Sequence, residues 1–205
     1  MDRKEEIILA ALELAAEKGL SGVTMSQIAD RLGIKKPSLY NHFGSKDEIV
    51  GAMYGYLREK SKENLASSDI DYGELVKGKT AEDVLLCSVS NYMKMCSDEK
   101  MLTFYKVIYS ERAVNPAAAK IMTEETKRMI KTTKNLFYAL QVHKKIRAES
   151  IDTAAVSFAM TVHAMMEHRF DCLCAGEPEP QGMIENYIRW FCRELGGESY
   201  EKDAD

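Results

Sequence analysis

A group of hydrogen-bond donors lies between residues 35 and 42 of this 205-residue chain. Lysine, serine, tyrosine, asparagine and histidine side chains can donate to phosphate oxygens and to base edges, the two kinds of contact that proteins make with duplex DNA. Leu39 and Phe43 stand among and after them and are expected to hold the segment against its neighbours. The donors are Lys35, Lys36, Ser38, Tyr40, Asn41 and His42. Their types and spacing predict a surface that contacts DNA.

Local capping signals indicate which elements position these donors. Thr24 and Gln27 have the spacing of a capping box, which starts a helix, and Gly33 can end it because glycine adopts the left-handed conformation without a Cβ penalty. Pro37 suits the first turn of a second short helix, predicted over about residues 37–43. The first helix has apolar residues at the 3.6-residue period, namely Met25, Ile28, Ala29 and Leu32. Two short helices joined by a glycine-containing turn predict a helix-turn-helix.

Two longer helices are predicted on either side of this motif. One covers about residues 3–18, ends at Gly19 and should pack across both motif helices. Ser45 and Glu48 form a second capping pair, which starts another helix at about Lys46 that continues toward Leu65. This second long helix is expected to connect the DNA-contacting unit to the rest of the chain.

The charge distribution also indicates a local polyanion partner. Between residues 18 and 46 there are five basic residues and one acidic residue, Asp30, whereas the whole chain has a net charge of −4. The five basic residues are Lys18, Arg31, Lys35, Lys36 and Lys46. A positive region on an acidic protein favours one local contact with nucleic acid over general stickiness.

The N-terminal quarter resembles the DNA-binding domain of the tetracycline-repressor (TetR) family of bacterial regulators. The resemblance extends from Ile7 to Val50. It is carried by Gly19, Thr24, the Ile28-Ala29 pair, Gly33, the Leu39-Tyr40 pair, the His42-Phe43 pair and Lys46.

The resemblance implies which side chains face DNA. The set it implies is Ser26, Lys35, Lys36, Ser38, Tyr40, Asn41, His42 and Lys46. Within it, Tyr40, His42 and Lys46 are expected to contact mainly the phosphate backbone. Lys35, Lys36 and Asn41 occupy positions that vary in the family, so they are expected to determine which operator is read. For Ser26 and Ser38, a hydroxyl bonded to its own helix backbone is the alternative.

Composition indicates an all-α fold. The chain has 4 prolines and 12 methionines, is 45% hydrophobic and 29% charged, and has no convincing run of period-2 alternation. We therefore predict an N-terminal three-helix DNA-binding domain followed by a C-terminal helical bundle. The charged first six residues lack an apolar stretch behind them, and no uncharged stretch of membrane-spanning length occurs, so we expect a cytoplasmic protein without a membrane partner. Five cysteines without framework spacing fit a reducing compartment.

The predicted domains are residues 1–46 for DNA binding, residues 47–197 for ligand binding and dimerisation, and an acidic tail, 198–205, expected to be disordered. In the second domain, Thr80 and Asp83 begin one helix and Pro116 begins a long one that ends near His143. Two more are predicted over about residues 149–175 and 181–195.

Methionine and aromatic residues of the second domain suit an adaptable, mostly apolar ligand pocket. The candidate set is Tyr92, Met95, Phe104, Tyr105, Ile108, Tyr109, Met122, Met129, Phe158, Val162, His163 and Met166. His163 is the candidate polar anchor. The alternative is that these residues form ordinary core and that His163 is a satisfied core histidine.

The segment from about residue 149 to 175 is apolar nearly all round for its first five turns, so one neighbour cannot cover it. Small residues there allow close approach, and the last helix has a matching apolar stripe. In the TetR family the last two helices form a four-helix dimer bundle, and these two look similar. The candidate interface is Ala154, Ala155, Ile184, Tyr187, Ile188 and Phe191. A dimer would place two reading helices about 34–36 Å apart, which suits a palindrome.

Cys172, Cys174 and His168 are candidates for a metal or redox site because positions i and i+4 share a helix face. Two cysteines in a C-x-C pattern do not both point at one centre on a helix, and a free cysteine is commonly a small buried apolar residue, so no metal and no cofactor are predicted. No nucleophile–base pair, phosphate-binding glycine loop or paired-carboxylate motif indicates an enzyme.

The sequence thus predicts a homodimeric transcriptional regulator, a repressor released from a palindromic operator by a small-molecule effector. Two alternatives stay open. One is a DNA-binding architectural or partner-recruiting protein without a ligand, and the other is an all-α metal enzyme that uses His163, His168 and the cysteines.

Overall fold

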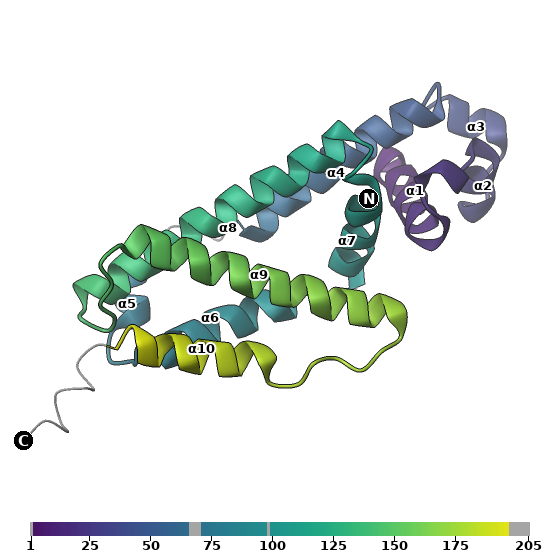
Figure 1. Ribbon diagram of the computed structural model, residues 1–205. Coiled ribbons are helices and arrows are strands. Elements are labelled where there is room, and N and C mark those ends of the chain that lie inside the picture. The colour runs from purple at the N-terminus through teal and green to yellow at the C-terminus, as the bar shows by residue number, and fades with distance from the viewer. Residues whose placement is uncertain (1, 66–70, 98, 197–205) are drawn as a thin grey trace, which may run out of the picture. The chain divides into compact units, whose positions relative to one another are not determined.

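The computed structural model describes residues 2–65, 71–97 and 99–196 (Figure 1). No strand occurs in those residues, and the extended pairing among them is one isolated bridge between Ile146 and Gly196. The predicted all-α class is confirmed. The helices are α1 Arg3–Lys18, the 3-10 turn η1 Leu20–Gly22, α2 Met25–Arg31, α3 Lys36–Tyr40, α4 Lys46–Leu65, α5 Tyr72–Val76, α6 Ala81–Cys96, α7 Glu99–Glu111, α8 Pro116–Val142, α9 Ile151–Ala175 and α10 Met183–Glu194. The predicted acidic tail lies outside the described residues.

The chain forms two compact units. Unit 1 is Met1–Ser67 with Met95–Glu125, and unit 2 is Ser68–Lys94 with Thr126–Asp205. Helices α4 and α7 therefore belong with the N-terminal helices, and α8 contributes its first turns to unit 1 and the rest to unit 2. The predicted domain boundary after residue 46 stays a prediction.

The ends of α2 confirm the predicted local chemistry. The Gln27 backbone N–H donates to the Thr24 hydroxyl (3.3 Å), and the Thr24 N–H donates to the Gln27 side-chain oxygen (3.0 Å), which completes the capping box. At the other end of α2, Gly33 has φ +65°. Its N–H donates to the backbone carbonyl of Asp30, and the Ile34 N–H donates to the backbone carbonyl of Ala29 (3.0 Å). These two bonds form a Schellman motif, which turns the chain sharply toward α3.

Helix α3 is shorter than predicted. It ends at Tyr40, because the next residues form a turn in which the His42 and Phe43 N–H groups both donate to the Leu39 carbonyl. The second capping pair is confirmed with one difference. The Glu48 N–H donates to the Ser45 hydroxyl (3.1 Å), but the Glu48 carboxylate accepts from the Gly44 N–H (2.7 Å), one residue earlier than in a standard box.

Unit 1 is organised around α1, which packs against α2, α4 and α7. Its fully buried side chains come from each of these helices and from α3, and they include Ile7, Ile28, Leu39, Ile49, Met53 and Ile108. Burial of such side chains contributes roughly 1.5–3 kcal/mol each. Short helices that could not persist alone are therefore stabilised by a shared core.

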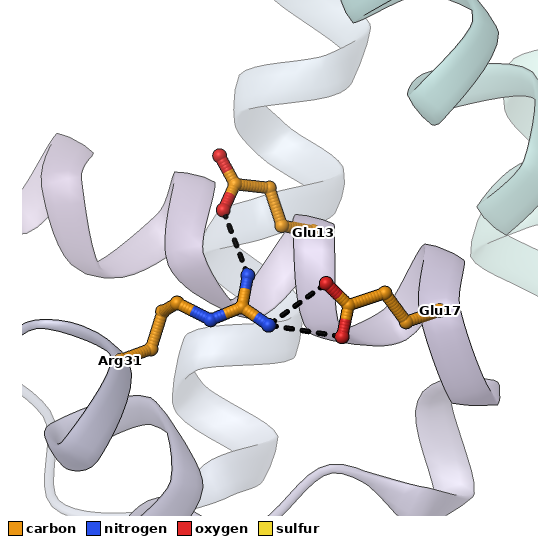
Figure 2. A network of polar contacts seen from close by, with 3 residues as sticks. All are labelled: Glu13, Glu17 and Arg31. Atoms are coloured by element: carbon orange, nitrogen blue, oxygen red, sulfur yellow. Dashed lines mark hydrogen bonds and ion pairs between the residues drawn. The ribbon is translucent and has the colours of Figure 1, made fainter.

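Arg31 links α2 to α1 through two carboxylates (Figure 2). Its guanidinium donates to Glu17 at 2.8 and 2.9 Å and to Glu13 at 3.1 Å. The hydrogen bond to Glu17 is the main cause that raises the Arg31 pKa. Arg31 is one of the five basic residues that make residues 18–46 positive in the sequence. The structure corrects this count, because two acidic residues outside the counted window neutralise Arg31.

Unit 2 has a core built from α5, α6, α8, α9 and α10. Four rings lie at its centre: Phe158 is 5.4 Å from Phe137, 5.1 Å from Phe191 and 5.8 Å from Tyr187, measured between ring centroids. Helix α9 starts two residues later than predicted, since Ser150 serves as its N-cap by accepting from the Thr153 N–H. Within the described ranges, the molecule contains no helix with the length and apolar character needed to cross a bilayer.

The Arg31 network predicts a specific loss of stability. Arg31→Ala should lower the midpoint of thermal unfolding, because it removes the bonds that join two helices. Arg3→Ala is the matched control, since Arg3 pairs with Glu6 of the same helix. The difference should shrink in about 1 M salt, where exposed ion pairs are screened. Thermal unfolding of both variants is measured by circular dichroism. Equal midpoints for the two variants at low salt would contradict this role.

Candidate nucleic-acid interface

The structure exposes most of the predicted DNA-contacting residues around α2 and α3. Ser26 is exposed in the first turn of α2. Lys35, Lys36, Ser38, Tyr40 and Asn41 are exposed on α3 and at its ends, whereas His42 and Lys46 are half-buried. The predicted donors of α3 therefore share one short element. Their contacts with DNA stay a prediction.

Two buried side chains hold α3 in place. Leu39 is fully buried and Phe43 is 4% exposed, whereas Tyr40 between them is 46% exposed. This alternation confirms that the apolar residues anchor the segment and leaves the polar ones outside. Lys36 Nζ lies 6.0 Å from the centroid of the Tyr40 ring, a cation–π contact that keeps an ammonium group beside a phenol.

The exposed groups have suitable chemistry for duplex DNA. A lysine can donate to the O6 and N7 atoms of guanine. An asparagine side chain can donate to N7 of adenine and accept from its N6 amino group. Lys35, Lys36 and Asn41 provide these groups. Serine and tyrosine hydroxyls can donate to phosphate oxygens without regard to sequence. The face could thus combine positioning contacts with base recognition.

Lys46 has a partner inside the free protein. Its Nζ donates to the backbone carbonyl of Ser21 (3.3 Å), which ties the start of α4 to the turn η1. Sequence reasoning also missed Lys4, whose Nζ lies 5.7 Å from the centroid of the Phe43 ring. Lys4 is an exposed cation beside the end of α3. A local pattern could not reveal it because the contact joins residues far apart in the chain.

The predicted ligand-binding set is divided between the two units. Unit 1 contains Met95, Phe104, Tyr105, Ile108, Tyr109 and Met122, and unit 2 contains Tyr92, Met129, Phe158, Val162, His163 and Met166. In unit 1, Tyr105 stacks on Tyr109 (5.6 Å) and meets Phe104 edge-on (5.0 Å), and the Arg112 guanidinium lies 4.6 Å from the Tyr109 centroid. In unit 2, Phe158 and Val162 belong to the core, as the alternative reading expected.

His163 lies near an acidic residue of its own helix. Its Nε2 is 3.8 Å from the Glu167 carboxylate, and its side chain is 18% exposed. This pairing gives His163 a partner within α9. Its role as a ligand anchor stays a prediction.

Most of the residues predicted for the dimer interface lie in the core of a single chain. Ala155, Ile184, Ile188 and Phe191 are between 0 and 8% exposed in a single chain, where they form the core of unit 2. They stabilise one protomer and are not available at its surface, which corrects the sequence interpretation. Ala154 and Tyr187 are half-buried, and burial raises the Tyr187 pKa. The periodicity of α9 and α10 indicates which residues are buried. It does not indicate whether they are buried within one chain or between two copies.

Other apolar residues of these helices are exposed. Met160 is 42%, Leu173 47% and Trp190 48% exposed. Trp190 lies 5.9 Å from the Tyr187 ring. Met160 lies opposite the buried residues of α9, whereas Leu173 is 13 residues later, roughly 140° around the helix, so these two residues do not share one exposed side.

The cysteine and histidine group at the end of α9 does not converge. Cys172 is buried and its sulfur is 3.9 Å from His168 Nε2, whereas Cys174 is exposed. In the stretches that the structure describes, no three His, Cys, Asp or Glu side chains are grouped closely enough to hold a metal ion.

Comparison with known proteins identifies both parts of the chain. Residues 7–53 match the family model of bacterial regulatory proteins of the tetR family. Residues 83–193, more than half of the chain, match the model described as AefR-like transcriptional repressor, C-terminal domain. The two matches cover the DNA-contacting motif and most of the remaining helices.

Individual relatives match mainly at the N-terminus. The tetracycline repressor protein class C of Escherichia coli is 32% identical over 77 residues, which are 37% of this chain and 35% of that protein. The transcriptional activator FasR of Mycolicibacterium smegmatis is 40% identical over 52 residues, 25% of this chain and 24% of that protein. The chain thus matches between a quarter and about a third of the length of these curated relatives.

A solved structure shares the whole fold. A transcriptional regulator from Saccharomonospora viridis in complex with choline superposes with a TM-score of 0.62 at 16% identity, covering 93% of each chain. At this identity the likeness shows the fold alone. With the family models over both parts of the sequence, the chain belongs to the TetR family of transcriptional regulators.

Proposed function

We propose that this regulator binds a palindromic operator as a homodimer in the cytoplasm and leaves it when a small molecule binds the C-terminal helices. The observation that carries the DNA part is the construction of α3. Buried Leu39 and Phe43 fix a short helix whose outer residues are nearly all hydrogen-bond donors. In this proposal α3 enters the major groove while α2 crosses the phosphate backbone, and Tyr40, His42 and Lys46 contact phosphates.

Repression is the direction that the relatives favour. The C-terminal model is named for a transcriptional repressor, and the class C relative is a repressor. FasR is an activator, but its match is confined to a quarter of each chain. We therefore propose that binding of this protein lowers transcription from its target promoters.

Exposed apolar residues of α9 and α10 support a dimer. Met160 of α9 and Trp190 of α10 would be buried between two copies, with half-buried Tyr187 beside Trp190. Large exposed aromatic and methionine side chains are typical of interface centres. Pairing through these residues gives the two-fold symmetry that a palindrome needs.

Unit 1 offers groups for a small, partly polar ligand. Helix α7 contributes the ring group of Phe104, Tyr105 and Tyr109. The Tyr54 hydroxyl of α4 is buried and makes no hydrogen bond in the described part of the chain, and burial, with a contribution from the Glu111 carboxylate, raises its pKa to about 12. A buried hydroxyl without a partner costs free energy that a ligand could recover. The choline complex of the Saccharomonospora protein shows that a chain with this fold can hold a small molecule.

The packing of unit 1 supplies a path from ligand to DNA. Helix α7, which carries four of the predicted ligand residues, packs on α1, and α1 packs on α2 and α4. A ligand that displaces α7 would therefore bias the helices that hold α3. It can do so only by its difference in affinity for the two conformations.

The alternative is a DNA-binding protein that recruits partners without a ligand. Ligand-induced loss of operator affinity separates the two readings. If no compound in a diverse library changes operator binding, the sensor part of the proposal fails and the DNA-binding part stands.

Two lysine variants test the division of roles on DNA, after selection of the bound sequence from random duplexes. Lys46→Ala should weaken binding equally on all sequences and reduce the slope of log affinity against log salt by about one. Lys36→Ala should change the preference at particular base pairs by about 1–3 kcal/mol. Unfolding midpoints of both variants control for loss of the Ser21 bond. A uniform loss for both variants, or a selected site without palindromy, would refute this assignment.

Trp190→Glu tests the dimer. A charge at the centre of the proposed interface should convert the protein to a monomer in sedimentation equilibrium and reduce operator affinity by at least about tenfold. Val114→Glu is the control, since Val114 is 79% exposed in the α7–α8 connection. It should leave the dimer intact. A wild-type protein that is monomeric at micromolar concentration would remove the proposed interface altogether.

A further inference from the structure

A second positive region lies in unit 2, away from the DNA-contacting motif in the sequence. Between Thr126 and Ala148 there are seven basic residues and no acidic residue, in a chain whose net charge is −4. The seven are Lys127, Arg128, Lys131, Lys134, Lys144, Lys145 and Arg147. They occupy the second half of α8 and the connection to α9. Nothing in the operator-binding proposal uses them.

Part of this region forms one exposed stripe along α8. Lys127, Lys131, Asn135, Tyr138 and Val142 follow each other at intervals of four, four, three and four residues, which keeps them on one face. All five are exposed, and Val142 and Tyr138 reach 78% and 47% exposure. We name these five residues the α8 stripe. It is roughly 22 Å long, from the rise of an α-helix.

The lysines of the stripe have no carboxylate partner in the described residues, whereas a lysine beside the stripe does. Lys134 Nζ lies 3.1 Å from the Asp152 carboxylate of α9. Lys127 and Lys131 form no such ion pair within residues 2–65, 71–97 and 99–196. Their ammonium groups face solvent, so an acidic partner could approach them without first breaking a bond.

The Tyr138 ring is held in position although it is exposed. Its hydroxyl donates to the Asp152 carboxylate (2.8 Å), the same oxygen that Lys134 approaches. A fixed aromatic side chain loses little conformational entropy when a partner covers it. With Val142 one turn away, the stripe has an ordered apolar end and a cationic end.

We propose that the α8 stripe is a docking surface for an acidic, amphipathic protein segment. Carboxylates of the segment would pair with Lys127 and Lys131, and an apolar residue would cover Tyr138 and Val142. Protein interfaces combine buried apolar side chains with polar and charged ones, and the stripe offers both kinds. The length of the stripe matches a partner helix of three to four turns.

The two other anionic partners fit the stripe less well. Along its backbone duplex DNA offers phosphates and sugars, which would pair with the lysines but give Val142 and Tyr138 no large apolar surface to pack against. An anionic membrane surface requires a broad apolar face to insert, and this face has two such residues at one end. The combination of cations and ordered apolar side chains favours a protein. This inference does not depend on a ligand or on the operator.

Fluorescence anisotropy of the full-length protein tests the proposal. The probe is a fluorescein-labelled peptide built from repeats of two glutamates and two leucines, and its comparison is the same peptide with lysine in place of glutamate. The acidic peptide should bind and the basic one should not. The double variant Lys127→Glu/Lys131→Glu should weaken binding by about tenfold, and Val142→Ser by a few-fold. Salt should weaken the wild-type complex.

The matched control is Lys106→Glu/Lys120→Glu, which makes the same change in net charge at two exposed lysines outside the stripe. It should change peptide affinity by less than about twofold. Far-UV circular dichroism establishes that every variant is folded. Equal losses for both double variants, or no peptide binding by the wild type, would overturn the proposal. So would a stripe variant that loses binding to non-operator duplex or to phosphatidylserine vesicles while it keeps the peptide, since the stripe would then serve nucleic acid or membrane.

Discussion

The presentation of donors to DNA depends on the burial of one side of a five-residue helix. A helix as short as Lys36–Tyr40 has no stability of its own, because the first turn fixes several residues for few hydrogen bonds. It exists here because Leu39 and Phe43 enter a core organised by α1, and because the Schellman turn at Gly33 fixes its approach. A change in the position of α1 is therefore expected to change the position of α3 and of the donors that it exposes. This constraint explains why unit 1 contains several helices that are not proposed to contact DNA, since they form the core that holds α3.

Sequence reasoning succeeded where the chemistry is local. The box of Thr24 and Gln27, the stop at Gly33 and the cap at Ser45 join residues a few positions apart, and the structure contains them all. It failed where partners are distant. Arg31 is counted as a free cation by any local window, yet Glu17 and Glu13 lie 14 and 18 residues earlier. The apolar side of α10 was found correctly, but its assignment to a partner copy required knowing that one chain already buries it.

The same limit governs the reading of charge. Two regions of this acidic chain are rich in lysine, and their positive charge alone does not distinguish the partners that they could bind. The structure separates them by what accompanies the cations. Around α3 they stand with hydroxyl and amide donors, which suit phosphates and base edges. Along α8 they stand with an ordered tyrosine and an exposed valine, which suit a protein surface. Neither distinction follows from net charge, because the identity of the neighbours on the folded face decides it.

The position of α7 bears on how any effector could act. Its ring-bearing residues are among the predicted ligand contacts of unit 1, and the helix packs on α1, which in turn packs on α2. A change at α7 therefore reaches α3 through a shared core, where packing allows discrete rearrangements more readily than gradual ones. To change occupancy of the competent state from nearly complete to nearly absent, an effector needs a difference in affinity worth about 5.5 kcal/mol. A partner for the Tyr54 hydroxyl, worth about 1–3 kcal/mol, would provide part of that difference, and apolar contacts with Phe104 and Tyr105 would have to provide the rest.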